Sequence, residues 1–351
     1  MKNIKQNIQY IDYFKALLMI LVILGHINYA NQAIKAWIYA FHMPAFFYAS
    51  GLLLKNRPVP NIRDGAFLLW KRFRVLIFPY FIWALLYASF SDSNLVRIIY
   101  GSHQSLASAK TLTSLWFLPV LFEAIALFFL AQLVFKEKLT FLVKLLLAAV
   151  SFAIAAFLPP LRHGYPWCSN VSFAAFGFLL LGNLLYPTIQ QAQKKAVISK
   201  KCVVVWLLVA VIGLAGSFLY LLNLPKGGFI LMANAKYGNF LLFILTACFG
   251  TAFAISLSIL LDKIRSKCEP GKLDWLSFLG QNTLCAFVVQ KPIIRWFKNI
   301  FKFIPAPQVV ALLVTCAGTV IGCCLMAMFI NRYFPAMVGK IPQRELENLD
   351  K

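Results

Sequence analysis

Long apolar runs separated by short polar segments dominate the hydrophobic pattern of this 351-residue chain. A helix needs about 20 mostly apolar residues to cross the hydrocarbon core of a bilayer, which is about 30 Å thick. Ten runs approach or exceed this length, so the pattern predicts an all-α, polytopic membrane protein with about ten transmembrane helices. The predicted spans cover residues 11–30, 34–54, 74–91, 114–135, 139–158, 168–186, 202–222, 238–261, 275–296 and 307–330.

The composition agrees with this interpretation. Hydrophobic residues make up 61% of the chain and charged residues only 13%, whereas a soluble domain needs a polar surface. No polar segment between the predicted spans is long enough for a separate soluble domain. We therefore expect a single domain over residues 1–351, with any chemistry inside the helix bundle or at its faces.

The formal net charge of +23 allows two explanations, nucleic-acid binding and the positive-inside bias of membrane proteins. About two thirds of the 34 Lys and Arg residues fall in the alternate segments that share a side with the N-terminus, as the positive-inside rule requires. This distribution favours the second explanation. It predicts both termini in the cytoplasm, a multi-pass protein of the cell (inner or plasma) membrane, and membrane lipids rather than nucleic acid as partners.

The eight cysteines are scattered, and most lie inside apolar runs. None has the CxxC spacing of a metal site, and they do not suggest a disulfide framework. We therefore expect no metal.

The first two predicted spans carry four ionisable residues, Asp12, Lys15, His26 and His42. A charged side chain at the centre of a membrane helix costs about 2.5–3.5 kcal/mol, so such residues often mark a site. The helical rise places both histidines at similar depths towards the outer end of a tight hairpin. A histidine is a suitable general base near neutral pH, for example for a sugar hydroxyl. Alternatively, each imidazole only hydrogen-bonds a neighbouring helix.

Asp12 and Lys15 are three residues apart, so they share one helical face at the predicted cytoplasmic end. One interpretation is a structural ion pair in which Lys15 extends to the membrane interface. The other is a polar anchor beside a ligand that enters from the cytoplasm.

Lys71, Arg72 and Arg74 precede the third predicted span, with Pro79 one to two turns later. Clustered basic residues at a membrane interface commonly bind anionic lipid head groups. They also suit the phosphates of a nucleotide-containing cofactor, to which Arg offers bidentate hydrogen bonds. Charge alone favours lipid head groups as the ligand of these residues.

Glu123 lies about nine residues into the fourth predicted span. A carboxyl at that depth is expected to be neutral or paired and is a candidate catalytic group. Lys144, one turn into its span, is expected to extend its amine to the interface. The amides of Asn170, Asn183, Asn282 and Gln290 are expected to form hydrogen bonds between helices.

Several short motifs together resemble a known family. They are Tyr10-Ile11-Asp12 with Lys15, Gly25-His26, Phe41-His42-Met43-Pro44 with Ser50-Gly51, Arg72-Phe73-Arg74 leading into Pro79-Tyr80, Leu115-Trp116-Phe117-Leu118-Pro119, and Leu279-Gly280-Gln281-Asn282-Thr283. The chain resembles the acyltransferase family 3 membrane proteins over nearly its whole length. Within that family it is most similar to the branch of fucose 4-O-acetylases and exopolysaccharide O-acetyltransferases.

The resemblance implies an integral-membrane O-acyltransferase. Such an enzyme moves an acyl group, usually acetyl, from cytoplasmic acyl-CoA to a hydroxyl of a carbohydrate or a lipid-linked glycan. Acetyl-CoA is then the expected co-substrate. The resemblance also implies an essential role for His26, and coenzyme contacts for Arg72, Arg74 and Lys71. For these three basic residues, the resemblance therefore favours coenzyme phosphates over lipid head groups as the ligand.

The sequence departs from the family pattern at two places. The element in the ninth span often continues to a His before a Pro in the family, whereas this chain has Gln290-Lys291-Pro292. The arginines before Pro79 are separated by one residue rather than two.

Our hypothesis for the site has His26 as general base and His42 as the group that orients or stabilises it, with Glu123 as a further catalytic candidate. Lys71, Arg72, Arg74, Asp12 and Lys15 are the expected coenzyme contacts. A transporter or flippase of lipid-linked sugars is the alternative. Such proteins commonly carry inverted repeats and broken helix pairs, and neither is evident in this sequence.

Overall fold

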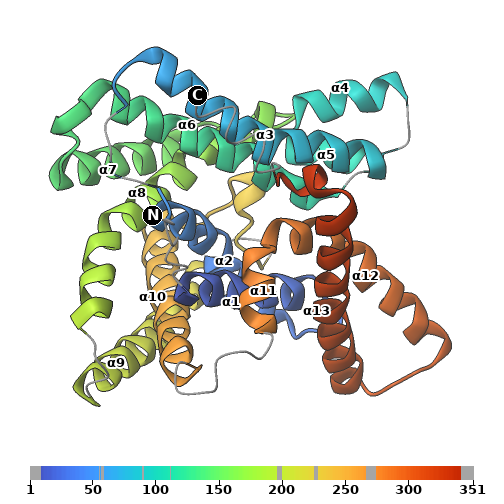
Figure 1. The fold of residues 1–351 in the computed structure, drawn as a ribbon. Helices are drawn as coiled ribbons and strands as arrows, with labels where there is room; N and C mark the ends of the chain where they lie inside the picture. The colour runs from blue at the N-terminus through green and yellow to red at the C-terminus, as the bar shows by residue number, and fades with distance from the viewer. Residues whose placement is uncertain are drawn as a thin grey trace. The chain divides into compact units, whose positions relative to one another are not determined.

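The computed structural model describes residues 9–54, 56, 59–88, 91–110, 112–195, 200–224, 228–265 and 274–340. Within these residues the chain is helical, and the β-structure found there is one isolated bridge between Leu231 and Lys236. The all-α prediction is therefore confirmed. The main helices in Figure 1 are α1 (Gln9–His26), α2 (Gln32–Leu52), α3 (Ile62–Tyr87), α4 (Asp92–Tyr100), α5 (His103–Ser108), α6 (Phe117–Phe135), α7 (Phe141–Phe157), α8 (Ser169–Lys195), α9 (Lys200–Ser217), α10 (Phe240–Arg265), α11 (Trp275–Gln281), α12 (Thr283–Phe303) and α13 (Gln308–Tyr333).

Six helical segments of the described chain are long and apolar enough to cross a membrane. They are Gln9–His26, Thr113–Lys138, Pro166–Pro187, Val203–Asn223, Phe240–Arg265 and Gln308–Tyr333. The apolar helix α7 is shorter, with 17 residues. Helices α2, α3 and α12 have the length but are more polar. A membrane protein is thus supported, while ten spans and two cytoplasmic termini stay predictions.

Every predicted span coincides with helix, but two differ from the predicted pattern. Helix α3 begins at Ile62, well before the predicted start at residue 74, because the Asn61 side chain caps it by accepting from the Asp64 backbone N–H. The ninth span consists of two helices, α11 and α12, that meet at Asn282. Hydropathy alone misses both features, since capping and a helix break depend on local polar contacts.

The segment predicted as the loop after the third span contains the two short helices α4 and α5. In α4, Ile98 is buried, whereas Leu95, Val96 and Ile99 are exposed. An amphipathic helix of this kind is typical of a segment at the membrane interface.

The chain divides into two compact units. The first unit comprises Met1–Ala49, Thr188–Ile230 and Gly238–Leu325, and the second comprises Ser50–Pro187, Leu231–Tyr237 and Met326–Lys351. The segments alternate along the sequence, so neither unit is continuous. The single domain expected from the sequence stays a prediction.

Helix α1 is the central element of the first unit. Its aromatic residues Tyr10, Tyr13 and Phe14 are almost completely buried, and it packs against α10, α11 and α12 (Figure 1). A Cβ on Gly280 of α11 would lie 1.9 Å from the backbone oxygen of Asp12. Glycine at position 280 is therefore what permits this close approach of α11 to α1.

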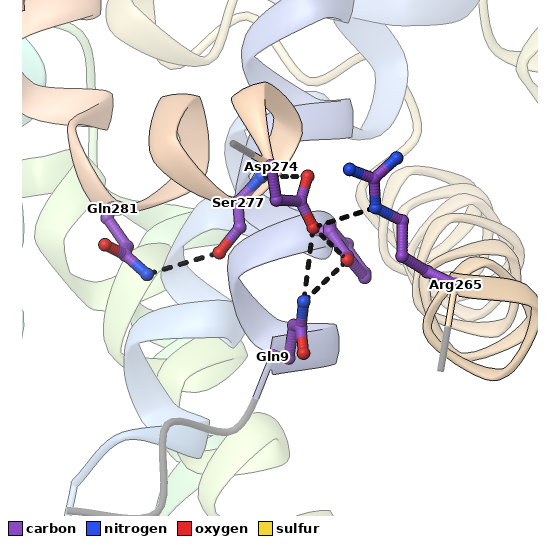
Figure 2. Close-up of polar contacts among 6 residues, drawn as sticks. Gln9, Arg265, Asp274, Ser277 and Gln281 are labelled. Atoms are coloured by element: carbon purple, nitrogen blue, oxygen red, sulfur yellow. Dashed lines mark hydrogen bonds and ion pairs between the residues drawn. The ribbon is translucent and has the colours of Figure 1, made fainter. Parts of the chain in front are cut away.

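Asp274 joins the start of α11 to α1 and α10, as Figure 2 shows. Its Oδ1 accepts from the Ser277 backbone N–H at 3.2 Å and caps α11. Its Oδ2 accepts from the Tyr13 hydroxyl and from Gln9 Nε2, and lies 3.3 Å from Arg265 Nε. The two carboxylate oxygens therefore have separate roles, one within α11 and one between helices.

In the second unit, α3 packs against α6 and the short helix Pro335–Val338. Lys144 was expected to extend its amine to the interface, and this prediction is wrong. The side chain is buried, and its Nζ donates to Asn183 Oδ1 at 2.9 Å and to Asn56 Oδ1 at 2.6 Å. Asn183 also donates to the carbonyls of Gly51 and Leu54. Two amide oxygens thus draw the ammonium inward and hold the chain after α2.

Replacing Asp274 with Asn should weaken the contact between α11 and α1 while keeping the helix cap. The amide group in place of Oδ2 would face three donors, and we expect a loss of roughly 1 kcal/mol in unfolding free energy at neutral pH. Burial acts to raise the pKa of Asp274, but the hydrogen bonds from Tyr13 and Ser277 and the charge of Arg265 hold it below its ordinary value of 3.8. A carboxyl whose pKa is lowered in the folded state stabilises the folded protein at pH values above 3.8. This stabilisation is lost as the pH falls through the pKa of the folded state.

The stability difference between wild type and Asp274→Asn should therefore narrow between pH 7 and pH 3. Thermal unfolding in detergent across this range measures it, with the exposed carboxyl variant Glu137→Gln as control. A difference that stays constant down to pH 3 would contradict the role assigned to the carboxylate.

Candidate functional site

The connection between α1 and α2 brings two histidines to one aromatic side chain. Helix α1 ends at His26, the chain turns through residues 27–31, and Asn31 caps the start of α2 by accepting from the Ala33 backbone N–H at 2.7 Å. Tyr39 lies between the imidazoles, with ring centroids 6.4 Å from His26 and 5.2 Å from His42, both in edge contact. Both histidines therefore contact the same tyrosine ring, and their matched depth in a membrane stays a prediction.

Tyr39 was not identified from the sequence. It precedes His42 by three residues on α2, so it shares a helical face with His42. That spacing was the available signal, but an aromatic residue in an apolar helix is too common to stand out.

His42 is held in one tautomer. The side chain is buried, and its Nδ1 lies 2.7 Å from the carbonyl oxygen of Ile38. A carbonyl can only accept, so Nδ1 carries the hydrogen, and Nε2 of the neutral ring keeps its lone pair. His42 can thus accept a proton or a hydrogen bond at Nε2.

His26 has an equivalent arrangement with a residue from α12. Its Nδ1 lies 3.4 Å from Oε1 of Gln290, whose side chain is completely buried. Donation from Nδ1 to the amide oxygen leaves Nε2 of His26 as the basic atom. An imidazole whose Nδ1 hydrogen is engaged in this way presents Nε2 in a defined direction, which suits a proton acceptor. Gln290 was expected only to hydrogen-bond between helices, and this contact gives it a more specific partner.

Asp12 and Lys15 form an ion pair at the opposite end of α1, with 2.9 Å between Nζ and Oδ1. Asp12 is buried, and its Oδ2 accepts from Gln281 Nε2 at 3.0 Å. This end of α1 is about 21 Å from His26 by the helical rise. Both side chains are thus engaged where α1 meets α11, and their contact with a coenzyme stays a prediction.

The basic residues of α3 lie on two different faces of that helix. Lys71 and Arg74 are three residues apart and share a face, whereas Arg72 points about 160° away from Arg74. Lys71 Nζ lies 4.3 Å from the centre of the Phe67 ring, a cation–π distance. Arg72 is partly buried and forms no hydrogen bond or ion pair with any residue that the structure describes. The three residues do not form a single cluster, and Lys71 and Arg74 are the pair with two residues between them.

Glu123 on α6 accepts a hydrogen bond from the Ser172 hydroxyl of α8. The partner of this carboxyl is therefore a neutral hydroxyl. Glu123 forms no ion pair with any residue that the structure describes. Just before Ser172, Trp167 and Cys168 have φ values of 53° and 56°. Non-glycine residues in this left-handed region cost about 1–3 kcal/mol and occur often at functional sites.

The eight candidate residues therefore form separate groups. His26, His42, Asp12 and Lys15 belong to the first unit, at the two ends of α1 and on α2. Lys71, Arg72, Arg74 and Glu123 belong to the second unit. Within the first unit, the His26 imidazole contacts Gln290 and Tyr39, and Tyr39 also contacts His42.

Comparison with known proteins gives one match. The family model described as an acyltransferase domain, Acyl_transf_3, matches residues 8–328. Neither the curated proteins nor the solved structures gave a match. The matched range contains all eight candidate residues, segments of both units and the six apolar helices apart from the last turns of α13. The chain thus belongs to the Acyl_transf_3 family of membrane acyltransferases.

Proposed function

We propose that this protein is an O-acetyltransferase of the cell membrane. It moves the acetyl group of cytoplasmic acetyl-CoA to a hydroxyl of a cell-surface or lipid-linked carbohydrate. The observation that supports this proposal best is the pair of imidazoles around Tyr39, because both have their Nδ1 atoms directed at acceptors. Oriented imidazoles in an apolar helix pair are suited to proton transfer.

In the proposed reaction, His26 Nε2 removes the proton of the acceptor hydroxyl. The oxygen attacks the thioester carbonyl, a C–O bond forms and the C–S bond breaks. The imidazolium then returns the proton to the departing thiolate, so one ester and one free thiol result. Gln290 acts as a positioning residue for His26, and His42 is the further group that orients or stabilises this base.

The basic residues of α3 would hold the coenzyme phosphates. Lys71 and Arg74 share a face and can contact one phosphate together. Arg72 adds positive charge, and its guanidinium has donors available. Asp12 and Lys15 would serve as a polar anchor at the cytoplasmic end of α1. Glu123 is proposed as a further catalytic candidate, because a carboxyl that accepts from Ser172 keeps lone pairs for a sugar hydroxyl.

The alternative function, a transporter or flippase of lipid-linked sugars, is not favoured by any of these contacts. The family match indicates acyl transfer.

Replacing His26 with Ala should lower transfer from labelled acetyl-CoA by about 100-fold or more, since general-base catalysis contributes about 10²–10⁴. Labelled surface glycan can be quantified in cells that carry the wild-type or variant gene, at matched expression. The exposed His163 offers a control, and His163→Ala should transfer like wild type. Full activity of His26→Ala would refute the assignment.

Replacing Gln290 with Met keeps an unbranched side chain of similar length but removes the side-chain acceptor for His26 Nδ1. We expect kcat to fall by about tenfold, the usual cost of one hydrogen bond of about 1.4 kcal/mol, with little change in KM. Gln290→Glu restores an acceptor and should recover part of kcat. If Gln290→Met and wild type have equal kcat, Gln290 does not position the base.

Replacing Arg74 with Gln should raise KM for acetyl-CoA by about tenfold, because a charge-assisted hydrogen bond contributes about 1.5–3 kcal/mol. Arg72→Gln should have a smaller effect, since it lies on another face. The exposed Arg63 near the start of α3 is the control, and Arg63→Gln should leave KM unchanged. If Arg74→Gln changes the dependence on anionic lipid and leaves KM alone, these residues bind head groups.

A further inference from the structure

Two aromatic side chains of α3, Trp70 and Phe73, stack on one another near the basic residues, and we call this pair the platform. The rings of Trp70 and Phe73 are stacked, with centroids 5.5 Å apart and an interplanar angle of 8°. Trp70 is 52% exposed, which is high for an indole. Phe73 therefore supports one part of the indole while much of the ring stays open to a further partner.

Arg74 and Lys71 lie on the same side of α3 as this indole. At about 100° per residue, Arg74 is about 40° from Trp70 around the helix axis, and Lys71 is about 60° further on. Arg72 falls on the opposite side. Two cationic residues on one face make contact of that face with lipid tails costly. This face of α3 therefore meets water, head groups or a polar ligand.

An open aromatic ring next to cationic side chains matches the chemistry of a nucleotide. A base stacked on an aromatic side chain gains about 1–3 kcal/mol, whichever base it is. Arg binds phosphate through two parallel hydrogen bonds, and Lys adds a point charge. Trp70 and Arg74 are about one helical turn apart, so one ligand can stack on the indole and bind the guanidinium through a phosphate.

The platform is also fixed to the body of the second unit. Phe73 makes an edge contact with Phe122 of α6, at 6.1 Å between centroids, and Phe122 makes another with Trp167 at 6.4 Å. Phe122 directly precedes Glu123. The stacked pair is thus held by the helix that carries the candidate carboxyl.

We propose that Trp70 and Phe73 form the stacking platform for the adenine base of acetyl-CoA, with Arg74 and Lys71 on the neighbouring phosphates. This inference rests on the proposed function for the identity of the nucleotide. Anchoring in the head-group region is the other common use of an exposed Trp near Lys and Arg. An anchor would respond to the lipid and not to the nucleotide part of the donor.

Truncated donors separate these two uses of Trp70. Trp70→Ala should raise KM for acetyl-CoA by about tenfold, from the lost stacking energy, and leave KM for acetyl-pantetheine, which lacks the nucleotide, unchanged. Trp70→Phe keeps an aromatic ring and should stay close to wild type. Trp296 of α12 is also exposed and follows Arg295, so Trp296→Ala is the matched control and should change neither KM.

The platform is wrong if Trp70→Ala affects both donors equally or neither. If Trp70→Ala changes only the thermal stability, by an amount that depends on the lipid, Trp70 is a membrane anchor instead. The proposed function can fail separately, if wild-type protein transfers acetyl from neither donor. Tryptophan fluorescence then still tests the platform: coenzyme A, but not pantetheine, should quench wild type more than Trp70→Phe, and equal quenching would overturn the inference.

Discussion

The close approach of α11 to α1 is the contact on which the first unit depends. Gly280 lets the two backbones meet at Asp12, where a side chain would not fit. Around that point the buried Asp12 finds Lys15 and Gln281, and the carboxylate of Asp274 takes donors from three helices. An apolar environment makes unpaired charges costly, so the Asp12 carboxylate can be buried only because its partners Lys15 and Gln281 are this close.

The same packing determines what happens at the other end of α1. Because α12 continues from α11 after Asn282, the docking of α11 on α1 also sets the position of α12 relative to His26. Gln290 then reaches the imidazole from α12. A structural contact at one end of α1 thereby supports a candidate base at the other end, about 21 Å away by the helical rise.

The second unit carries groups of a different chemical kind. It holds basic residues on two faces of α3, a stacked aromatic pair, and a carboxyl paired with a hydroxyl. Its own buried charge, Lys144, is satisfied by two amide oxygens instead of a carboxylate. The polar groups of the second unit thus differ in chemistry from the oriented imidazoles of the first unit.

The sequence by itself determined the helical class, the apolar segments and the hairpin with two histidines, because these follow from local hydrophobicity and helical period. It also indicated the family, through short motifs spread over most of the chain. The tertiary structure decided the partners: Gln290 for His26, Tyr39 for both imidazoles, Ser172 for Glu123, and Asn183 for Lys144. Most of these pairs join residues far apart in the chain, and Tyr39 is a common residue type in an apolar helix. Which side chains meet depends on how helices pack, and no local pattern of residues encodes that.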